Sequence, residues 1–259
     1  MYQIRYAFHW IFGICHAIIN IVFIVFTRKE DVMAKKIFTN LDEITTAVKP
    51  SELTVIAARP AMGKTTFALR ILQEAAANDK ASAIYFTLNE KKDSVRQKLL
   101  SMQPDLNFEN IFIEDAACSV VEICDMCKKV KDEHGLDFVV IDYLQLMGGT
   151  GKDTGRKEEV AEIVRMLKNL AKEQGYAVIL ISELSRGPEE REDKRPRLSD
   201  FGESSVIADE ADTVMFLYRD EYYHKESEAK GILEITLAKN SNGKEDTAYT
   251  RLEDFHISL

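Results

Sequence analysis

Residues 55–69 combine the residue types that bind the phosphates of a nucleotide. An apolar run, Val-Ile-Ala-Ala, leads through Arg-Pro-Ala-Met into Gly63, Lys64 and Thr65. Backbone N–H groups at the start of a helix bind phosphate oxygens, a lysine follows the β- and γ-phosphates, and a hydroxyl binds Mg²⁺. The stretch therefore predicts a phosphate-binding loop between a strand and a helix.

The loop departs from the pattern G-x-x-x-x-G-K-[ST], because Ala58 stands where the first glycine is expected. A chance Gly-Lys-Thr at the start of an ordinary helix is the alternative. The flanks favour a phosphate loop, since Leu53–Ala57 is typical of a buried strand and Thr65–Ala77 has apolar residues at helical spacing. The predicted nucleotide-binding residues are Arg59, Pro60, Ala61, Met62, Gly63, Lys64, Thr65 and Thr66.

Asp142 ends a second apolar strand, Phe138-Val-Val-Ile-Asp. Ligands gather at the carboxyl ends of parallel strands, where a nucleotide-bound Mg²⁺ needs an acidic partner. A structural aspartate at a strand end is the alternative. Together with the phosphate loop, the residue predicts a nucleotide with its Mg²⁺ at this edge, with Thr65 and Asp142 as the metal-binding residues.

The rest of the chain alternates apolar strands with amphipathic helices. This order predicts an α/β fold, with a mainly parallel central sheet flanked by helices and antiparallel strands at the C-terminal end. A short helix is expected over 41–48 and a turn at Asn242-Gly243. The other expected strands are 83–88, 111–113, 177–182, 213–218, 232–238 and 247–252, and the other expected helices are 93–102, 119–134 and 156–174.

Composition indicates a globular chain of one large domain, or one domain with an appendage, since 46% of its 259 residues are hydrophobic. The net charge of −9 gives no general support for nucleic-acid binding. The exception is the segment Glu183–Ser199, where five basic residues alternate with acidic ones. The segment can be interpreted as a solvated loop or as a nucleic-acid-binding loop, and its charge does not distinguish the two.

The N-terminal segment 1–32 differs in composition from the domain expected over 33–259. Residues 7–26 are apolar and nearly uncharged, long enough for a membrane anchor, although His9, His16 and Asn20 would then lie in hydrocarbon. In the other interpretation, which we favour, Met33 is the true start, because the codons for residues 28–33 can contain AAGGAGG just upstream of ATG. A cytoplasmic protein is then expected, and a membrane tether only if residues 1–32 are made.

These motifs resemble the ATPase domain of DnaB-like replicative DNA helicases, within the RecA-like P-loop proteins. The resemblance covers roughly 38–252 and explains Ala58, since the family writes its phosphate loop as Ala-Arg-Pro-x-Met-Gly-Lys-Thr. The matching segments are Asn40–Asp42, Ile56–Thr65, Ile141–Met147, Lys194–Asp200, Ala211-Asp212 and Phe216–Asp220.

The resemblance implies a ring-forming motor that binds ATP between neighbouring domains and tracks single-stranded DNA. Lys64 would bind the phosphates and Lys239 would reach the ATP of a neighbouring subunit. Expected partners are single-stranded DNA and either further copies in a ring or helicase and loader proteins. The family's N-terminal domain and linker helix have no counterpart of sufficient length in residues 33–50.

Four positions depart from the family pattern. Asn89 replaces the glutamate that polarises the attacking water, and Glu90 is one residue further on. Glu183 replaces a glutamine that links the γ-phosphate to the DNA loops, and its carboxylate would repel phosphate unless it is protonated or turned away. Gly202 and Ser241 replace a DNA-contacting arginine and the arginine finger.

Two hypotheses follow. In the first, the chain is an ATP-driven helicase core, with Lys64, Glu183 and Lys239 as its catalytic residues. In the second, it is an ATP-binding accessory module with little or no hydrolysis, since an arginine finger contributes about 10³–10⁵ in rate and a general base about 10²–10⁴.

Overall fold

The computed structural model describes residues 47–78, 81–151, 155–202, 205–241 and 245–252. The apolar segment 7–26, most of the short helix expected over 41–48 and the turn at 242–243 lie outside them. Among the described residues, no helix combines the length and apolar character needed to cross a bilayer. The elements are β1 (Leu53–Ala58), α3 (Lys64–Asn78), β2 (Ala83–Thr87), α4 (Lys92–Met102), β3 (Ile111–Glu114), α5 (Val120–His134), β4 (Phe138–Asp142), η1 (Leu144–Leu146), α6 (Arg156–Gln174), β5 (Ala177–Glu183), α7 (Gly187–Glu190), η2 (Leu198–Phe201), α8 (Ser205–Glu210), β6 (Thr213–Tyr218), α9 (Asp220–Tyr223), β7 (Ile232–Asn240) and β8 (Asp246–Arg251).

One eight-stranded sheet organises the described residues, in the order β3-β2-β4-β5-β1-β6-β7-β8. Neighbouring strands from β3 to β6 run parallel, and β7 and β8 are added antiparallel. This confirms the expected α/β fold with antiparallel C-terminal strands. The short helices η1, α7, η2, α8 and α9 lie outside the helices expected from the sequence.

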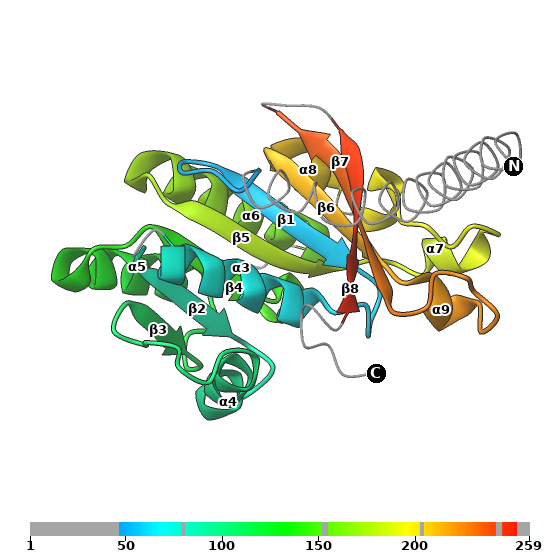
Figure 1. The fold of residues 1–259 in the computed structure, drawn as a ribbon. Helices are drawn as coiled ribbons and strands as arrows, with labels where there is room; N and C mark the ends of the chain where they lie inside the picture. Colours follow the sequence, from blue (N-terminus) through cyan, green and yellow to red (C-terminus); the bar gives the residue numbers. More distant parts are fainter. Residues whose placement is uncertain (1–46, 79–80, 152–154, 203–204, 242–244, 253–259) are drawn as a thin grey trace, which may run out of the picture.

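Both faces of the sheet are covered, which explains the almost uninterrupted apolar runs of its central strands. Successive residues of a strand point to opposite faces, so Ile56 and Ala58 join one core cluster while Val55 and Ala57 join the other. The first cluster includes side chains of α3 and α4, and the second includes those of α5 and α6. In Figure 1, α3 crosses in front of the strands and α6 lies behind them.

Local signals in the sequence set the ends of the helices on the second face. Ser119 and Glu122 form a capping box at the start of α5, in which each side chain bonds the backbone of the other residue. Gly175 ends α6 with a φ of 82°, a left-handed conformation that glycine adopts without strain.

The sheet brings the polar strand ends to one edge. Ala58 at the end of β1 is opposite Glu183 of β5, and Asp142 at the end of β4 is opposite Thr87 of β2. These residues share the carboxyl edge of the parallel strands, the edge at which open α/β sheets bind ligands.

Candidate nucleotide-binding site

The segment between β1 and α3 forms a tight loop at this edge. Ala61 and Gly63 have φ values of 62° and 92°, so the chain turns sharply before α3 begins at Lys64. The N–H of Phe67 donates to the carbonyl of Gly63 at 2.9 Å, which starts the hydrogen bonding of the helix. The N–H groups of the first turn have no helical partner, and the N-terminus carries a partial positive charge. The loop therefore has the geometry that binds phosphate.

Lys64 folds back over this loop. Its Nζ donates to the carbonyls of Ala58 at 3.2 Å and Arg59 at 3.1 Å. Burial lowers the pKa of Lys64, and the charges of Glu183 and Asp142 oppose that shift. An ammonium group with two acidic neighbours and a loop of backbone N–H groups is suited to follow the phosphates of a nucleotide.

Thr65 and Asp142, the two residues predicted to hold Mg²⁺, are in direct contact. The hydroxyl of Thr65 donates to Oδ2 of Asp142 at 2.6 Å, and Asp142 is only 2% exposed. Burial raises the pKa of Asp142, and the hydrogen bonds from Thr65 and Tyr85 oppose this shift. A hydroxyl and a carboxylate beside a phosphate loop fit Mg²⁺, which binds oxygen ligands and keeps several of its waters. The described part of the chain holds no group of three or more His, Cys, Asp and Glu side chains that could bind a metal by themselves.

Arg59 joins the phosphate loop to the segment after β5. Its Nε donates to Glu189 at 2.9 Å and its Nη1 to the carbonyl of Leu184 at 2.8 Å. The same guanidinium lies 3.6 Å from the carboxylate of Glu183. Gln145 bonds the backbone N–H and C=O of Glu183, at 3.0 and 2.9 Å. Glu183 therefore faces the phosphate loop, where Arg59 offsets its charge.

Two polar side chains follow β2, the amide of Asn89 and the carboxylate of Glu90. Asn89 is exposed, at the position where the resemblance expects the general base. The carboxylate of Glu90 accepts hydrogen bonds from Ser94 and Lys98 of α4, each at 2.6 Å. Glu90 is thus engaged by α4, which agrees with the expectation that a residue one position after Asn89 points elsewhere.

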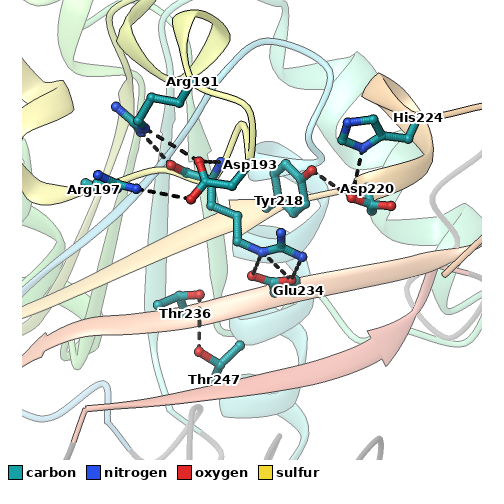
Figure 2. A network of polar contacts seen from close by, with 10 residues as sticks. Arg191, Asp193, Arg197, Tyr218, Asp220, His224, Glu234, Thr236 and Thr247 are labelled. Atoms are coloured by element: carbon teal, nitrogen blue, oxygen red, sulfur yellow. Dashed lines mark hydrogen bonds and ion pairs between the residues drawn. The ribbon is translucent and has the colours of Figure 1, made fainter. Parts of the chain in front are cut away.

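The basic segment 183–199 forms ion pairs within the chain. Arg191 donates to both oxygens of Asp200, at 2.8 and 2.6 Å, and Arg197 pairs with Asp193 at 3.1 Å. Figure 2 shows both arginines directed toward Asp193, and the neighbouring contacts of Tyr218 and His224 with Asp220. The ε nitrogen and one terminal nitrogen of Arg195 bond the carboxylate of Glu234 on β7, both at 2.9 Å. These pairs favour a structural loop over a nucleic-acid-binding one.

The C-terminal positions of the family pattern also have partners in this chain. Nζ of Lys239 donates to the carbonyls of Ala208 and Asp209, both at 2.8 Å, near the end of α8. The hydroxyl of Ser241 donates to the carbonyl of Asp212 at 2.9 Å. Lys239 therefore bonds the last turn of a helix in its own domain, and its role toward a neighbouring ATP stays a prediction.

Two residues that the sequence did not single out as binding residues contact the site. Tyr85 of β2 donates its hydroxyl to Asp142 at 2.7 Å. Arg219, which follows β6, donates to the carbonyl of Ala61 in the phosphate loop at 3.2 Å. Arg219 stands within the matched segment Phe216–Asp220, whereas for Tyr85 the only signal was a hydroxyl two residues before the end of a strand.

Comparison with known proteins matches this arrangement. The family model for the DnaB-like helicase C terminal domain covers residues 34–115 and 104–255. The chain belongs to the DnaB-like helicase family. It is 40% identical over 233 residues to "Replicative DNA helicase DnaC" of Bacillus subtilis (strain 168), and equally so to "Replicative DNA helicase DnaB" of Geobacillus stearothermophilus. Each match takes in 80% of this chain and 51% of the relative, so the DnaB-like chain spans about half the length of these curated relatives.

Solved structures show the same fold. One of them, an isolated ATPase domain, superposes with a TM-score of 0.78 at 32% identity, covering 89% of this chain and 95% of the other. A DnaB-like replicative helicase, solved in a study of its interactions with primase, gives a TM-score of 0.75 at 33% identity, covering 87% of this chain and 63% of the other. The described sheet and helices are therefore those of a DnaB-like ATPase domain.

Proposed function

We propose that this chain is the ATP-binding core of a DnaB-type DNA helicase, acting on single-stranded DNA, in which ATP binding is retained and ATP turnover is weak. The observation that supports ATP binding most strongly is the hydrogen bond between Thr65 and Asp142 beside Lys64. A Mg²⁺-nucleotide must be reached by an ammonium group, a hydroxyl and a carboxylate. Lys64, Thr65 and Asp142 carry these groups at the carboxyl edge of the sheet.

In this proposal each residue of the loop has a defined task. Lys64 and the N–H groups at the start of α3 bind the β- and γ-phosphates, and Thr65 and Asp142 hold Mg²⁺. The metal, when bound, supplies charge neutralisation of the phosphate oxygens. Arg59 keeps the carboxylate of Glu183 paired while phosphate enters, which reduces the repulsion expected from the sequence.

Weak turnover follows from the residues around the γ-phosphate position. Asn89 is an amide, and Glu90 bonds Ser94 and Lys98, so neither is free to polarise water. Glu183 ends β5 beside Lys64 and Arg59, and we propose its carboxylate as the group that supports residual hydrolysis. Ser241 offers no cation to a neighbouring ATP, although Lys239 could supply one after leaving α8.

A second candidate function is an ATP-binding accessory module of a helicase or loader complex, located in the cytoplasm, with no hydrolysis at all. The ion pair between Glu90 and Lys98 favours this second function. It engages the carboxylate that is nearest in sequence to Asn89, the position where the family has its general base.

Single-turnover ATP hydrolysis, with and without single-stranded DNA, separates the two candidates. The helicase core predicts slow turnover that DNA accelerates and that Glu183→Gln removes, with Glu90→Gln as the matched control that changes little. The accessory module predicts ATP binding without turnover under either condition. Absence of ATP binding would reject both.

A further inference from the structure

Tyr85 lies directly behind the candidate magnesium site. Its side chain is completely buried, and its hydroxyl donates to Oδ2 of Asp142 at 2.7 Å. Thr65 donates to the same oxygen at 2.6 Å. One carboxylate oxygen therefore receives two hydroxyl groups, one from β2 and one from α3, and Oδ1 is the oxygen to which neither hydroxyl donates.

The sheet register explains why Tyr85 reaches this carboxylate. Asp142 of β4 is paired with Thr87 of β2, and Tyr85 is two residues earlier on the same strand. Residues two apart share a face of the sheet and are separated by about 6.6 Å, a span that a phenol side chain covers. The face is the one covered by α3, which carries Thr65.

We propose that Tyr85 is a positioning residue for Mg²⁺ at the nucleotide site. A carboxylate held through Oδ2 by two donors cannot rotate about its terminal bond, so Oδ1 stays directed at the metal position or at a water of the metal. This inference rests on the proposed binding of Mg²⁺-ATP. It assigns to Tyr85 an effect on the metal rather than on the nucleotide itself.

The simpler explanation is that a buried tyrosine hydroxyl needs some hydrogen-bond acceptor. Tyr176 is a buried tyrosine of this simpler kind in the same protein. It is also completely buried, and its hydroxyl donates to the carbonyl of Cys127 at 3.4 Å. Tyr176 immediately precedes β5, at the amino end of a strand whose carboxyl end carries Glu183. It is therefore a matched control for the loss of one buried hydroxyl.

The test measures the affinity of a fluorescent ATP analogue in excess Mg²⁺ and in EDTA, for the full chain and for Tyr85→Phe and Tyr176→Phe. The readout is the ratio of the two affinities, which reports the tightening due to the metal. We expect Tyr85→Phe to lower this ratio by about 10-fold, as for the loss of a hydrogen bond to a charged group, and Tyr176→Phe to leave it unchanged. In an Asp142→Asn background, Tyr85→Phe should give no further fall.

Thermal unfolding of each variant verifies that it folds, and Tyr85→Met repeats the comparison with a side chain that has neither ring nor hydroxyl. An unchanged ratio in both Tyr85 variants, or equal weakening with Mg²⁺ and with EDTA, would overturn the positioning role while leaving the proposed function intact. A wild-type chain that binds ATP equally well with and without Mg²⁺ would also overturn the positioning role, and a wild-type chain that binds no ATP would overturn the proposed function as well.

Discussion

The nucleotide loop and the segments around it use their charged groups in different ways. In the loop, Lys64 bonds backbone carbonyls that ATP phosphates can replace, and Thr65 and Asp142 lie together where Mg²⁺ is expected. After β2 and β5, charged side chains are paired with one another, as Glu90 is with Lys98 and Arg191 with Asp200. In the proposed function the first region binds a ligand, whereas the side chains of the second pair with one another within the fold.

Under the proposed function, this difference is how a DnaB-like ATPase domain would retain ATP binding while its hydrolysis weakens. Binding requires a few groups on adjacent strands and one helix, which the fold itself brings together. By resemblance to the family, hydrolysis requires a general base and an arginine finger, and the proposed function assigns those two positions to Asn89 and Ser241. Variants in each region test the comparison, from the largest expected effect to the smallest.

Among these variants, removal of the Arg191 side chain should have the largest effect, which is a loss of stability. Arg191→Ala leaves Asp200 without its bidentate partner, and Asp200 is only 3% exposed, so we expect a loss of about 3 kcal/mol in the free energy of unfolding. Denaturant unfolding measures it. Arg197→Ala, which breaks an exposed pair with Asp193, is the control and should cost less than about 0.5 kcal/mol. Equal effects of the two variants would contradict a structural role for this segment.

Removing Lys64 should affect ligand binding instead. Lys64→Ala is expected to weaken ATP binding by about 100-fold, because the phosphates lose a charge-assisted partner in a partly buried loop. Calorimetric titration provides the affinity. The matched control is Lys98→Ala, whose ammonium pairs with Glu90, and it should leave ATP affinity within about 2-fold. Similar losses in both variants would show that the two regions are not distinct.

Restoring the family's arginine at Gly202 should not restore function. Gly202 has φ 65° and ψ −127°, a backbone conformation nearly confined to glycine, so Gly202→Arg should cost about 1–3 kcal/mol and bring no gain in DNA-stimulated hydrolysis. Thermal unfolding and ATPase assays test both parts. A stable variant with stimulated turnover would mean that this loop can still adopt the family's arrangement.

Much of this architecture is predictable from the sequence, because its signals are local. The apolar runs at β1 and β4 and the helical period after Thr65 identified the strands, the phosphate loop and the position of Asp142. The antiparallel β7 and β8 were also expected, from terminal strands that follow the alternating part.

The rest depends on contacts between distant segments. No periodicity indicates that Tyr85 reaches Asp142, 57 residues away, or that Arg59 reaches Glu189, 130 residues away. The pairing of Arg195 with Glu234 joins the basic segment to β7, and charge counts alone do not indicate it. Side-chain partners across the sheet follow from register, which a single sequence does not specify.

The central claim is that ATP binding has been retained while its hydrolysis has been weakened. Single-turnover hydrolysis of Mg²⁺-ATP, on a preparation whose ATP stoichiometry is measured in parallel, tests it most directly. We predict full ATP binding with a chemical step slower than roughly 0.01 s⁻¹, at least 100-fold below the lower end of ordinary enzyme turnover. Hydrolysis at about 1 s⁻¹ or faster that disappears in Lys64→Ala would contradict the account.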